Sequence, residues 1–212
     1  MKTIIKLSIG LAMIAGFAPA AQANESFNFK PYVGFDLQHQ ALDYNSSMDM
    51  GGGIALDGDK VLEDGLNGLN IHIGNRFNKH LGAELGYFRT RNESTNIAAG
   101  DSVGPGVVAA APFQTKVQLQ GITLDALGYL PLGQSERFEL IGTAGVSWIK
   151  ADAELDGVSD DSSELGFRLG AGAQFNVTEQ INLRGLVRYQ SADFDDVADR
   201  AYTYTLGMNY SF

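Results

Sequence analysis

The chain has 212 residues, no cysteine, and 25 acidic against 15 basic side chains, which gives a formal net charge of −10. The lack of cysteine excludes disulfides and thiolate metal sites, and the acidic balance argues against nucleic acid as a partner, because nucleic-acid binders present basic faces. No stretch after the N-terminal segment approaches about 18 consecutive apolar residues, so we expect no membrane-spanning helix.

The N-terminal segment has the pattern of a secretory signal peptide. Two lysines precede an uncharged apolar run, and residues 21–23 (AQA) place small side chains where a signal peptidase cleaves. We therefore expect a signal peptide over residues 1–23 and one domain over residues 24–212. Because the two lysines leave with the signal peptide, the remaining domain would carry a formal charge of −12.

Apolar and polar residues then alternate over eight segments, which predicts β-strands with one apolar and one polar face. In the first segment, Val33, Phe35 and Leu37 share the apolar face, whereas Gly34 and Asp36 share the other. The eight segments, in chain order, are 29–38, 69–77, 81–89, 117–130, 138–148, 165–175, 181–189 and 201–212.

The fourth segment breaks the alternation. Val117 and Leu119 hold one phase, and the apolar residues from Ile122 onward hold the other. One extra residue in a strand moves the following side chains to the opposite face. A β-bulge near Gln120-Gly121 would therefore reconcile the two phases, and the register of this strand is left open.

The connections between the segments alternate in length. Residues 78–80, 131–137 and 176–180 form short turns, whereas residues 43–67, 91–114, 151–162 and 191–200 form longer polar loops. Short turns at one end and long loops at the other are typical of outer-membrane barrels, whose short turns face the periplasm.

Aromatic residues of the apolar faces fall near the two ends of the predicted strands. Those near the short turns are Phe29, Phe77, Phe138, Phe175, Tyr210 and Phe212, and those near the long loops are Trp148, Tyr189 and Tyr202. Two aromatic rings around an apolar band are favoured at the interfaces of a bilayer. The pattern therefore predicts a barrel that crosses a membrane.

These features resemble the OmpA/OmpX-type eight-stranded outer-membrane barrels of Gram-negative bacteria. Stretches such as LGAELGYFR (81–89), LDALGYLPLG (124–133) and LGFRLGAGAQF (165–175) are similar to small porin-family proteins with an outer membrane protein beta-barrel domain. The resemblance covers residues 24–212 and implies an all-β, eight-stranded antiparallel transmembrane up-and-down β-barrel. Its motifs are specific for the fold and not for a function. OmpA itself continues into a peptidoglycan-binding domain, and since this sequence stops at the last strand, we do not expect cell-wall tethering by that route.

The face opposite the apolar one carries a predicted lumen charge network of Asp36, Arg76, Glu84, Glu139, Arg168, Arg184 and Arg188. A tight hairpin at 78–80 places Arg76 roughly opposite Glu84. The last short turn places Arg168 about opposite Arg188, and both then require acids from across the lumen. Eight strands leave an interior just wide enough for side chains. We therefore favour a network that plugs the lumen, with a gated path for ions or small solutes as the alternative.

The long loops are rich in carboxylates. The acidic residues are Asp57, Asp59, Glu63 and Asp64 in the first loop, Asp152, Glu154, Asp156, Asp160 and Asp161 in the third, and Asp193, Asp195, Asp196 and Asp199 in the fourth. Such residues suit Ca²⁺ or Mg²⁺, but their spacing matches no EF-hand, so a solvated charged surface is the preferred interpretation. Bridging of divalent cations to lipopolysaccharide phosphates is kept as a hypothesis.

The sequence offers little for catalysis. Some small outer-membrane barrels modify lipid A, and these need a histidine beside a serine nucleophile. The three histidines, His39, His72 and His80, show no His-x-Ser arrangement, although Ser46 and Ser47 follow His39 within the first loop. We therefore expect no enzyme activity and no catalytic, cofactor-binding or metal site.

The sequence thus predicts an outer-membrane barrel with a structural or surface-contact role, and a narrow porin-like channel as the alternative. The expected partners are outer-membrane lipid and lipopolysaccharide, periplasmic chaperones and the barrel-assembly machinery. An extracellular ligand would bind at loops 43–67 and 91–114, where the apolar run 98–113 suggests either a contact surface or a loop that packs on itself or on the barrel rim. Tyr210 and Phe212 resemble the C-terminal signal that the assembly machinery reads.

Overall fold

The computed structural model describes residues 29–44, 48–49, 55–56, 60, 65–104, 106–155, 158–194 and 198–212. The predicted signal peptide lies outside these residues. No helix in the described part of the chain is long and apolar enough to cross a membrane.

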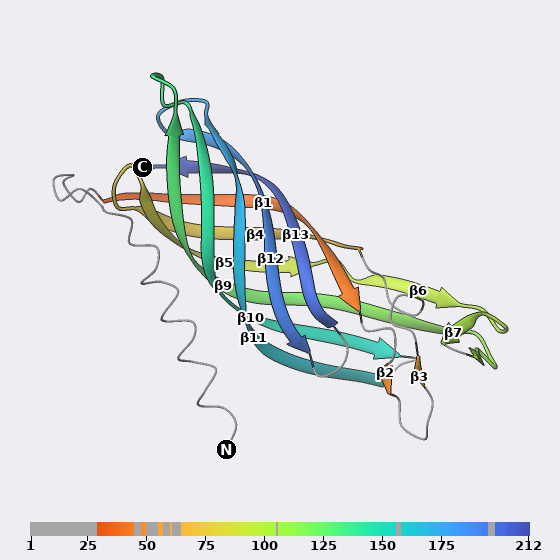
Figure 1. The fold of residues 1–212 in the computed structure, drawn as a ribbon. Coiled ribbons are helices and arrows are strands. Elements are labelled where there is room, and N and C mark those ends of the chain that lie inside the picture. Colours follow the sequence, from red (N-terminus) through yellow and green to blue (C-terminus); the bar gives the residue numbers. More distant parts are fainter. Residues whose placement is uncertain are drawn as a thin grey trace, which may run out of the picture.

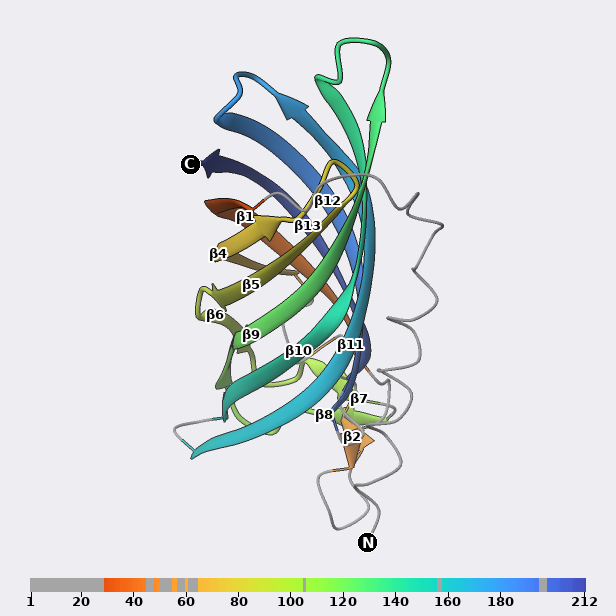
Figure 2. The same ribbon diagram turned by 90° about the vertical axis from the view of Figure 1, so that its left-hand side faces the viewer.

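Eight of the described strands close an antiparallel barrel (Figures 1 and 2). They are β1 (Lys30–Tyr44), β4 (Gly65–Arg76), β5 (Leu81–Thr90), β9 (Phe113–Leu132), β10 (Phe138–Leu155), β11 (Val158–Asn176), β12 (Ile181–Phe194) and β13 (Ala198–Ser211). Each pairs with the next along the chain, and β13 pairs with β1 to close the cylinder. The predicted fold class is confirmed.

The strands are staggered around the barrel. Following the paired Cα positions once round from Tyr32 leads back to Leu42, ten residues further along β1 (42 − 32 = 10). The intermediate positions are Gly74, Glu84, Asp125, Gly145, Arg168, Gln190 and Ala201. A stagger of this kind tilts the strands by roughly 35–45° to the barrel axis. Residues that meet inside the barrel therefore come from distant sequence positions.

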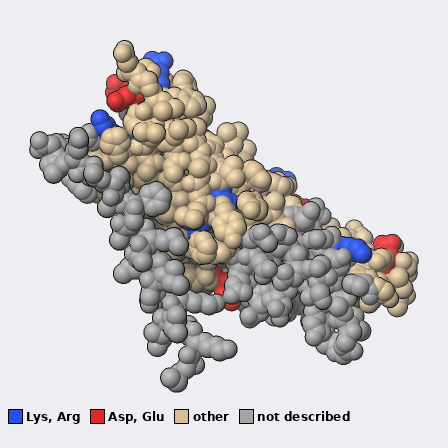
Figure 3. Space-filling view, viewed as in Figure 1, with Lys and Arg blue, Asp and Glu red and all other residues tan. Residues whose placement is uncertain are grey.

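The outer wall is apolar and bounded by aromatic side chains. Trp148 is 61% exposed and Phe212 is 71% exposed. Ring pairs form at both ends, with Phe138 against Phe175 and Tyr210 against Phe212 at the short-turn end and Tyr189 against Tyr202 at the other. In the face seen in Figure 3, a broad uncharged zone separates the charged residues of the short-turn end from those nearer the loops. The predicted facing of these aromatic residues is confirmed.

Several strands extend beyond the barrel at the end opposite the C-terminus (Figure 1). The predicted loop 151–162 is wrong for most of its length, because β10 and β11 stay paired up to Leu155 and Val158. Within the second loop, β6 (Glu93–Ile97) pairs with β9, and β7 (Ser102–Gly104) pairs with β8 (Val107–Val108). In the first loop, β2 (Met48–Asp49) pairs with β3 (Ala55–Leu56).

The apolar run 98–113 packs partly on itself. Val103 and Ala109 are buried with Ile97 of β6, and Val107 and Phe113 pack against them. This small cluster holds the β7–β8 hairpin against its own base. The self-packing interpretation is therefore confirmed for these residues, although Val108 remains exposed.

The bulge predicted near Gln120-Gly121 is absent. The pairing of β9 with β10 runs without a register shift from Thr115 to Leu132. Val117 and Leu119 accordingly point into the barrel, where both are buried. The phase change in the sequence reflects an apolar stretch of the lumen and not an extra residue.

Candidate functional site in the barrel lumen

The centre of the lumen is an arginine held by two carboxylates from other strands. Arg184 of β12 contacts Asp36 of β1 through Nε–Oδ1 and Nη2–Oδ2 distances of 3.0 and 2.9 Å. The same guanidinium donates to Glu84 of β5 through Nη1 to Oε2 at 2.6 Å and Nη2 to Oε1 at 3.1 Å. All three side chains are almost fully buried. Two forked contacts to one guanidinium give this cluster a defined geometry.

Polar side chains from neighbouring strands support the two carboxylates. Asn70 Nδ2 donates to Asp36 Oδ2 at 2.8 Å, and the Tyr32 hydroxyl donates to Glu84 Oε2 at 3.0 Å. His72 lies between them, with Nδ1 3.5 Å from Asp36 and Nε2 2.7 Å from Asn209 Oδ1. The cluster is thereby tied to five strands, because these residues come from β1, β4, β5, β12 and β13.

A second group of charges lies beside the first. Arg168 Nε is 3.2 Å from Asp125 Oδ1, and Arg188 Nη2 is 3.9 Å from Glu84 Oε1. Arg168 and Arg188, predicted to lie about opposite each other, are diagonal neighbours across the β11–β12 pair, with Gln190 and Gly170 as their Cα partners. Asp125 was missed by the sequence reasoning, because the expected bulge left the facing of its strand open. Unbroken alternation through Leu124 and Ala126 would have placed it in the lumen.

A further ion pair lies at the end of the network that is nearest the short turns. Arg76 binds Glu139 through two contacts of 3.0 and 2.7 Å, and Gln174 Nε2 donates to the same carboxylate at 3.0 Å. The guanidinium carbon of Arg76 also lies 4.2 Å from the centre of the Tyr129 ring, a cation–π contact. The sequence placed Arg76 roughly opposite Glu84, and the register sets the two diagonally, with Arg76 opposite Gly82. Glu84 is paired in register with Gly74, and its carboxylate points across the lumen.

The charges of the lumen network balance. Four guanidiniums, of Arg76, Arg168, Arg184 and Arg188, face four carboxylates, of Asp36, Glu84, Asp125 and Glu139. Buried charge is tolerated when it is paired and hydrogen-bonded. The network thus fills the lumen without net charge, inside a chain that is strongly acidic overall.

Apolar side chains form a separate layer between this network and the long loops, and we call it the apolar layer. Its buried members are Leu66, Phe88, Val117, Leu119 and Ile149. They come from β4, β5, β9 and β10, and Leu42 of β1 and Ala151 of β10 pack against them. A further cluster of Leu127, Tyr129, Ile141 and Leu186 lines the lumen nearer the short turns.

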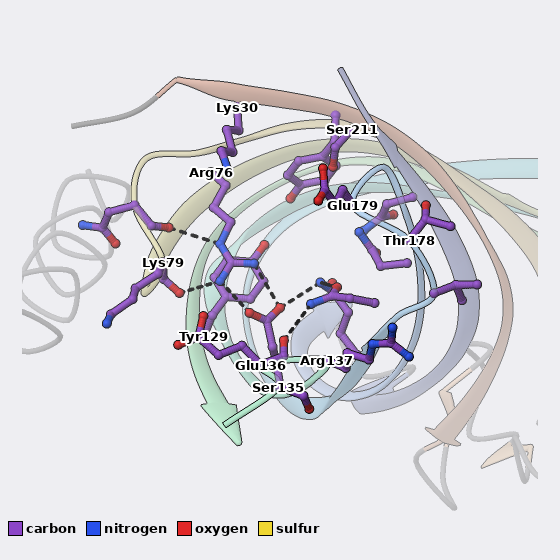
Figure 4. Close-up of a pocket in the computed structure, with 18 residues that line it drawn as sticks. Lys30, Arg76, Lys79, Tyr129, Ser135, Glu136, Arg137, Thr178, Glu179 and Ser211 are labelled. Atoms are coloured by element: carbon purple, nitrogen blue, oxygen red, sulfur yellow. Dashed lines mark hydrogen bonds and ion pairs between the residues drawn. The ribbon is translucent and has the colours of Figure 1, made fainter. Parts of the chain in front are cut away.

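A cavity of about 1130 Å³ opens below the network at the short-turn end, and we call it the vestibule (Figure 4). Its inner wall includes Tyr32, Tyr129 and the Arg76–Glu139 pair, and its rim carries Lys30 and Arg137. Figure 4 shows the Arg76 side chain reaching across the wall of this cavity, whose centre is free of side chains. The lumen therefore passes from a polar vestibule through a charged network to an apolar layer.

The acidic loop residues are only partly described. Asp152 pairs with Lys150 and Glu154 with Lys116, each at 3.0 Å. Of the other predicted acids, Asp57, Asp59, Glu63, Asp64, Asp156, Asp195 and Asp196 lie outside the described residues. The side chains of Asp160, Asp161, Asp193 and Asp199 are not described either. The divalent-cation hypothesis thus stays untested.

A family model for the outer membrane protein beta-barrel domain matches residues 9–212. A search of curated proteins finds no match. Among solved structures, Neisserial surface protein A (NspA) is 20% identical with a TM-score of 0.58, covering 86% of this chain and 97% of that one. OprG of Pseudomonas aeruginosa is 14% identical (TM-score 0.55; 88% and 97%), and the attachment invasion locus protein Ail of Yersinia pestis is 18% identical (TM-score 0.51; 89% and 100%). At these low sequence identities, the similarity shows the fold alone.

Proposed function

The chain belongs to the outer membrane protein beta-barrel domain family, and from that premise we propose that it is an outer-membrane barrel with a structural or surface-contact role and a closed lumen. The apolar outer wall between two sets of aromatic residues supports this location, because such residues favour the two interfaces of a bilayer. In this arrangement the short turns face the periplasm and the extended hairpins face the outside.

The proposed location requires export and assembly. Residues 1–23 would direct export and then be removed. Periplasmic chaperones and the barrel-assembly machinery would follow, with Tyr210 and Phe212 as the recognised residues. The backbone of Phe212 donates to Pro31 O at 3.1 Å, so the same residue takes part in joining β13 to β1. Lipid and lipopolysaccharide are the proposed surroundings of the finished barrel.

The main support for a closed lumen is that two different obstructions follow one another along it. Ions meet paired charges that are already satisfied around Arg184. Beyond these charges they meet the apolar layer, which offers no ligand to replace water. Rearrangement of the salt bridges alone would leave the second obstruction in place. A barrel of eight strands is also too narrow to leave free space beside these side chains.

The extended hairpins support the surface-contact role. The paired parts of β9, β10 and β11 continue well past Trp148, and β6 adds a further strand to β9. A rigid scaffold that presents loops is a common basis for binding. The names of Ail and NspA refer to attachment and to the cell surface, but their likeness to this chain shows the fold alone. An extracellular ligand at 43–67 or 91–114 is therefore proposed from the hairpins themselves.

A narrow channel is the second candidate, and the vestibule favours it. This cavity is large enough to hold water down to the level of Arg76 and Tyr129. In addition, Nε of Arg188 and both carboxylate oxygens of Asp125 have no hydrogen-bond partner among the described residues. Buried polar groups of this kind often bind water. Passage would still require the apolar layer to open.

Recordings in planar bilayers separate these two functions. We expect the folded wild-type protein to give no discrete conductance steps above the bare membrane, because both obstructions are closed. The same sample should migrate compactly on a gel before heating and more slowly after heating, which shows that the barrel is folded. Stable steps from a sample that passes this gel test would contradict the closed lumen and favour the channel.

We propose no catalytic role for the protein. His72 is enclosed by Asp36, Arg184 and Asn209. His39 contacts Asn67 at 3.0 Å, and His80 contacts the Tyr129 carbonyl at 3.1 Å. Among the described residues, no hydrogen bond joins one of these rings to a serine hydroxyl. A histidine needs such a partner to activate a serine nucleophile.

A further inference from the structure

Two exposed arginines stand at the loop-side end of β5. Arg89 and Arg91 flank Thr90, whose side chain is buried in the lumen, so both arginines lie on the outer side of the wall. In the part of the chain that the structure describes, neither has a carboxylate within ion-pair distance. Two uncompensated positive charges side by side are unexpected in a chain with a formal net charge of −10.

Neighbouring cations on the same wall are neutralised. Lys116 of β9 pairs with Glu154, and Lys150 of β10 pairs with Asp152, each at 3.0 Å. The acids in these pairs lie on β10, which is separated from β5 by β9, and each is taken up by a lysine. The charge of the two arginines therefore stays available to an external anion.

The guanidinium of Arg89 is held in place by neutral groups. Its Nη2 donates to Gln118 Oε1 at 3.1 Å, and Gln118 Nε2 donates in turn to the Thr90 carbonyl at 3.0 Å. The remaining N–H groups of Arg89 make no hydrogen bond to the described residues. A planar guanidinium with free, fixed donors is well suited to a phosphate group, which it binds through two parallel hydrogen bonds.

The height of this pair on the barrel fits a lipid headgroup. Arg89 is paired in register with Leu69, which is 55% exposed on the apolar wall, and it follows the aromatic Tyr87 by two residues. The Tyr87 hydroxyl donates to Gln120 Oε1 at 3.1 Å. The side chains of the outer wall therefore change from apolar to polar between the level of Tyr87 and that of Arg89. Aromatic residues mark the level at which headgroups begin.

We propose that Arg89 and Arg91 bind phosphate groups of a phosphorylated glycolipid in the outer leaflet, with Gln118 orienting Arg89. Asn67, whose carbonyl accepts from the Arg91 backbone, is exposed and contacts His39 through Oδ1. Its Nδ2 makes no hydrogen bond to the described residues and can donate to a sugar hydroxyl. This inference rests on the proposed function, which places the extended hairpins outside the cell.

Titration of the folded full chain in detergent micelles with lipid A tests the site. Lipid A with two phosphates is the probe, and monophosphoryl lipid A and phosphatidylglycerol are the comparison ligands. The readout is the rise in melting temperature as each lipid is added. We expect saturable binding of lipid A that is roughly ten- to thirty-fold weaker in Arg89→Gln/Arg91→Gln, given about 1 kcal/mol per basic residue at a membrane surface.

The control variant Lys30→Gln/Arg137→Gln removes two exposed charges at the short-turn end and is expected to bind lipid A as the wild type does. Equal affinity in the Arg89/Arg91 variant, or an equal loss in the control, would overturn the site. Binding of phosphatidylglycerol as tight as that of lipid A would overturn the assignment to a glycolipid. Heat-dependent gel migration of each sample reports separately on the barrel, so a failure of the proposed function is visible without reference to lipid A.

Discussion

Arg184→Met is expected to lower the free energy of unfolding by roughly 3–5 kcal/mol, the usual consequence of removing one partner from a buried ion pair. The substitution leaves the carboxylates of Asp36 and Glu84 in the lumen without the guanidinium that contacts both. Methionine fills much of the space, so the loss reflects unpaired charge more than lost volume. Urea titration of folding in detergent micelles or lipid vesicles measures the change.

The matched control replaces the whole charged cluster. The triple variant Asp36→Asn/Glu84→Gln/Arg184→Met removes the guanidinium together with both carboxylates and leaves only Arg188 without its carboxylate partner. It is expected to recover part of the lost stability, since neutral replacements of buried ion pairs are often tolerated. Arg137→Met, at the exposed rim of the vestibule, should change stability by less than about 0.5 kcal/mol. A single variant as stable as the triple variant would mean that Arg184 does not hold the two carboxylates.

Phe88→Ala is expected to lower the free energy of unfolding by roughly 3–5 kcal/mol, because the ring is buried in the apolar layer and leaves a cavity. Phe167→Ala is the control, since this ring lies on the lipid-facing wall. Lipid fills the space there, so only the transfer free energy of the ring, roughly 1.5–3 kcal/mol, is lost. Equal losses in the two variants would argue against a tightly packed layer.

Conductance gives a second readout for the same layer. Phe88→Ala alone should stay closed, because the charged network still blocks the lumen. The triple variant alone should stay closed as well, because the apolar layer remains. The combination of both is expected to give discrete conductance steps. Steps in the triple variant without the Phe88 change would show that the charged network is the sole barrier.

The alternation of apolar and polar residues in the sequence was sufficient to predict the barrel. Because successive side chains of a strand point to opposite faces, residues such as Phe35 and Asp36 could be assigned to wall and lumen from their order alone. The aromatic residues were informative for the same reason, since Trp148 and Tyr210 mark opposite ends of the wall. The closed sheet and its outward face followed from these two patterns.

The apolar layer could not be predicted in this way. Val117 and Leu119 are as apolar as the lipid-facing residues of the same strand, and a pattern of alternation cannot distinguish an apolar lumen from an apolar wall. A bulge was therefore the natural but wrong explanation. Continuous pairing of β9 with β10 removes the need for it and also places Asp125 in the lumen.

The ion pairs between lumen residues could not be predicted from the sequence either. Arg184 and Asp36 are 148 positions apart, and they meet because β13, which lies between their strands, carries the small Gly207 at that level. Arg76 pairs with Glu139 for a similar reason, since the stagger of ten residues brings distant strand ends to one height. Hairpin geometry alone predicts only the nearest neighbours along the chain.

Accessibility of a cysteine at position 147 tests the closed lumen most directly. The chain has no cysteine, so Ser147→Cys introduces the only thiol, at a site that is 1% exposed and two residues below Ile149 of the apolar layer. Ser135→Cys and Ser163→Cys supply exposed controls at the two ends of the barrel. In vesicles, we expect a membrane-impermeant maleimide to label each control from its own side, and to label position 147 from neither side until the protein is unfolded. Labelling of position 147 in the folded protein as fast as the controls would contradict the closed lumen.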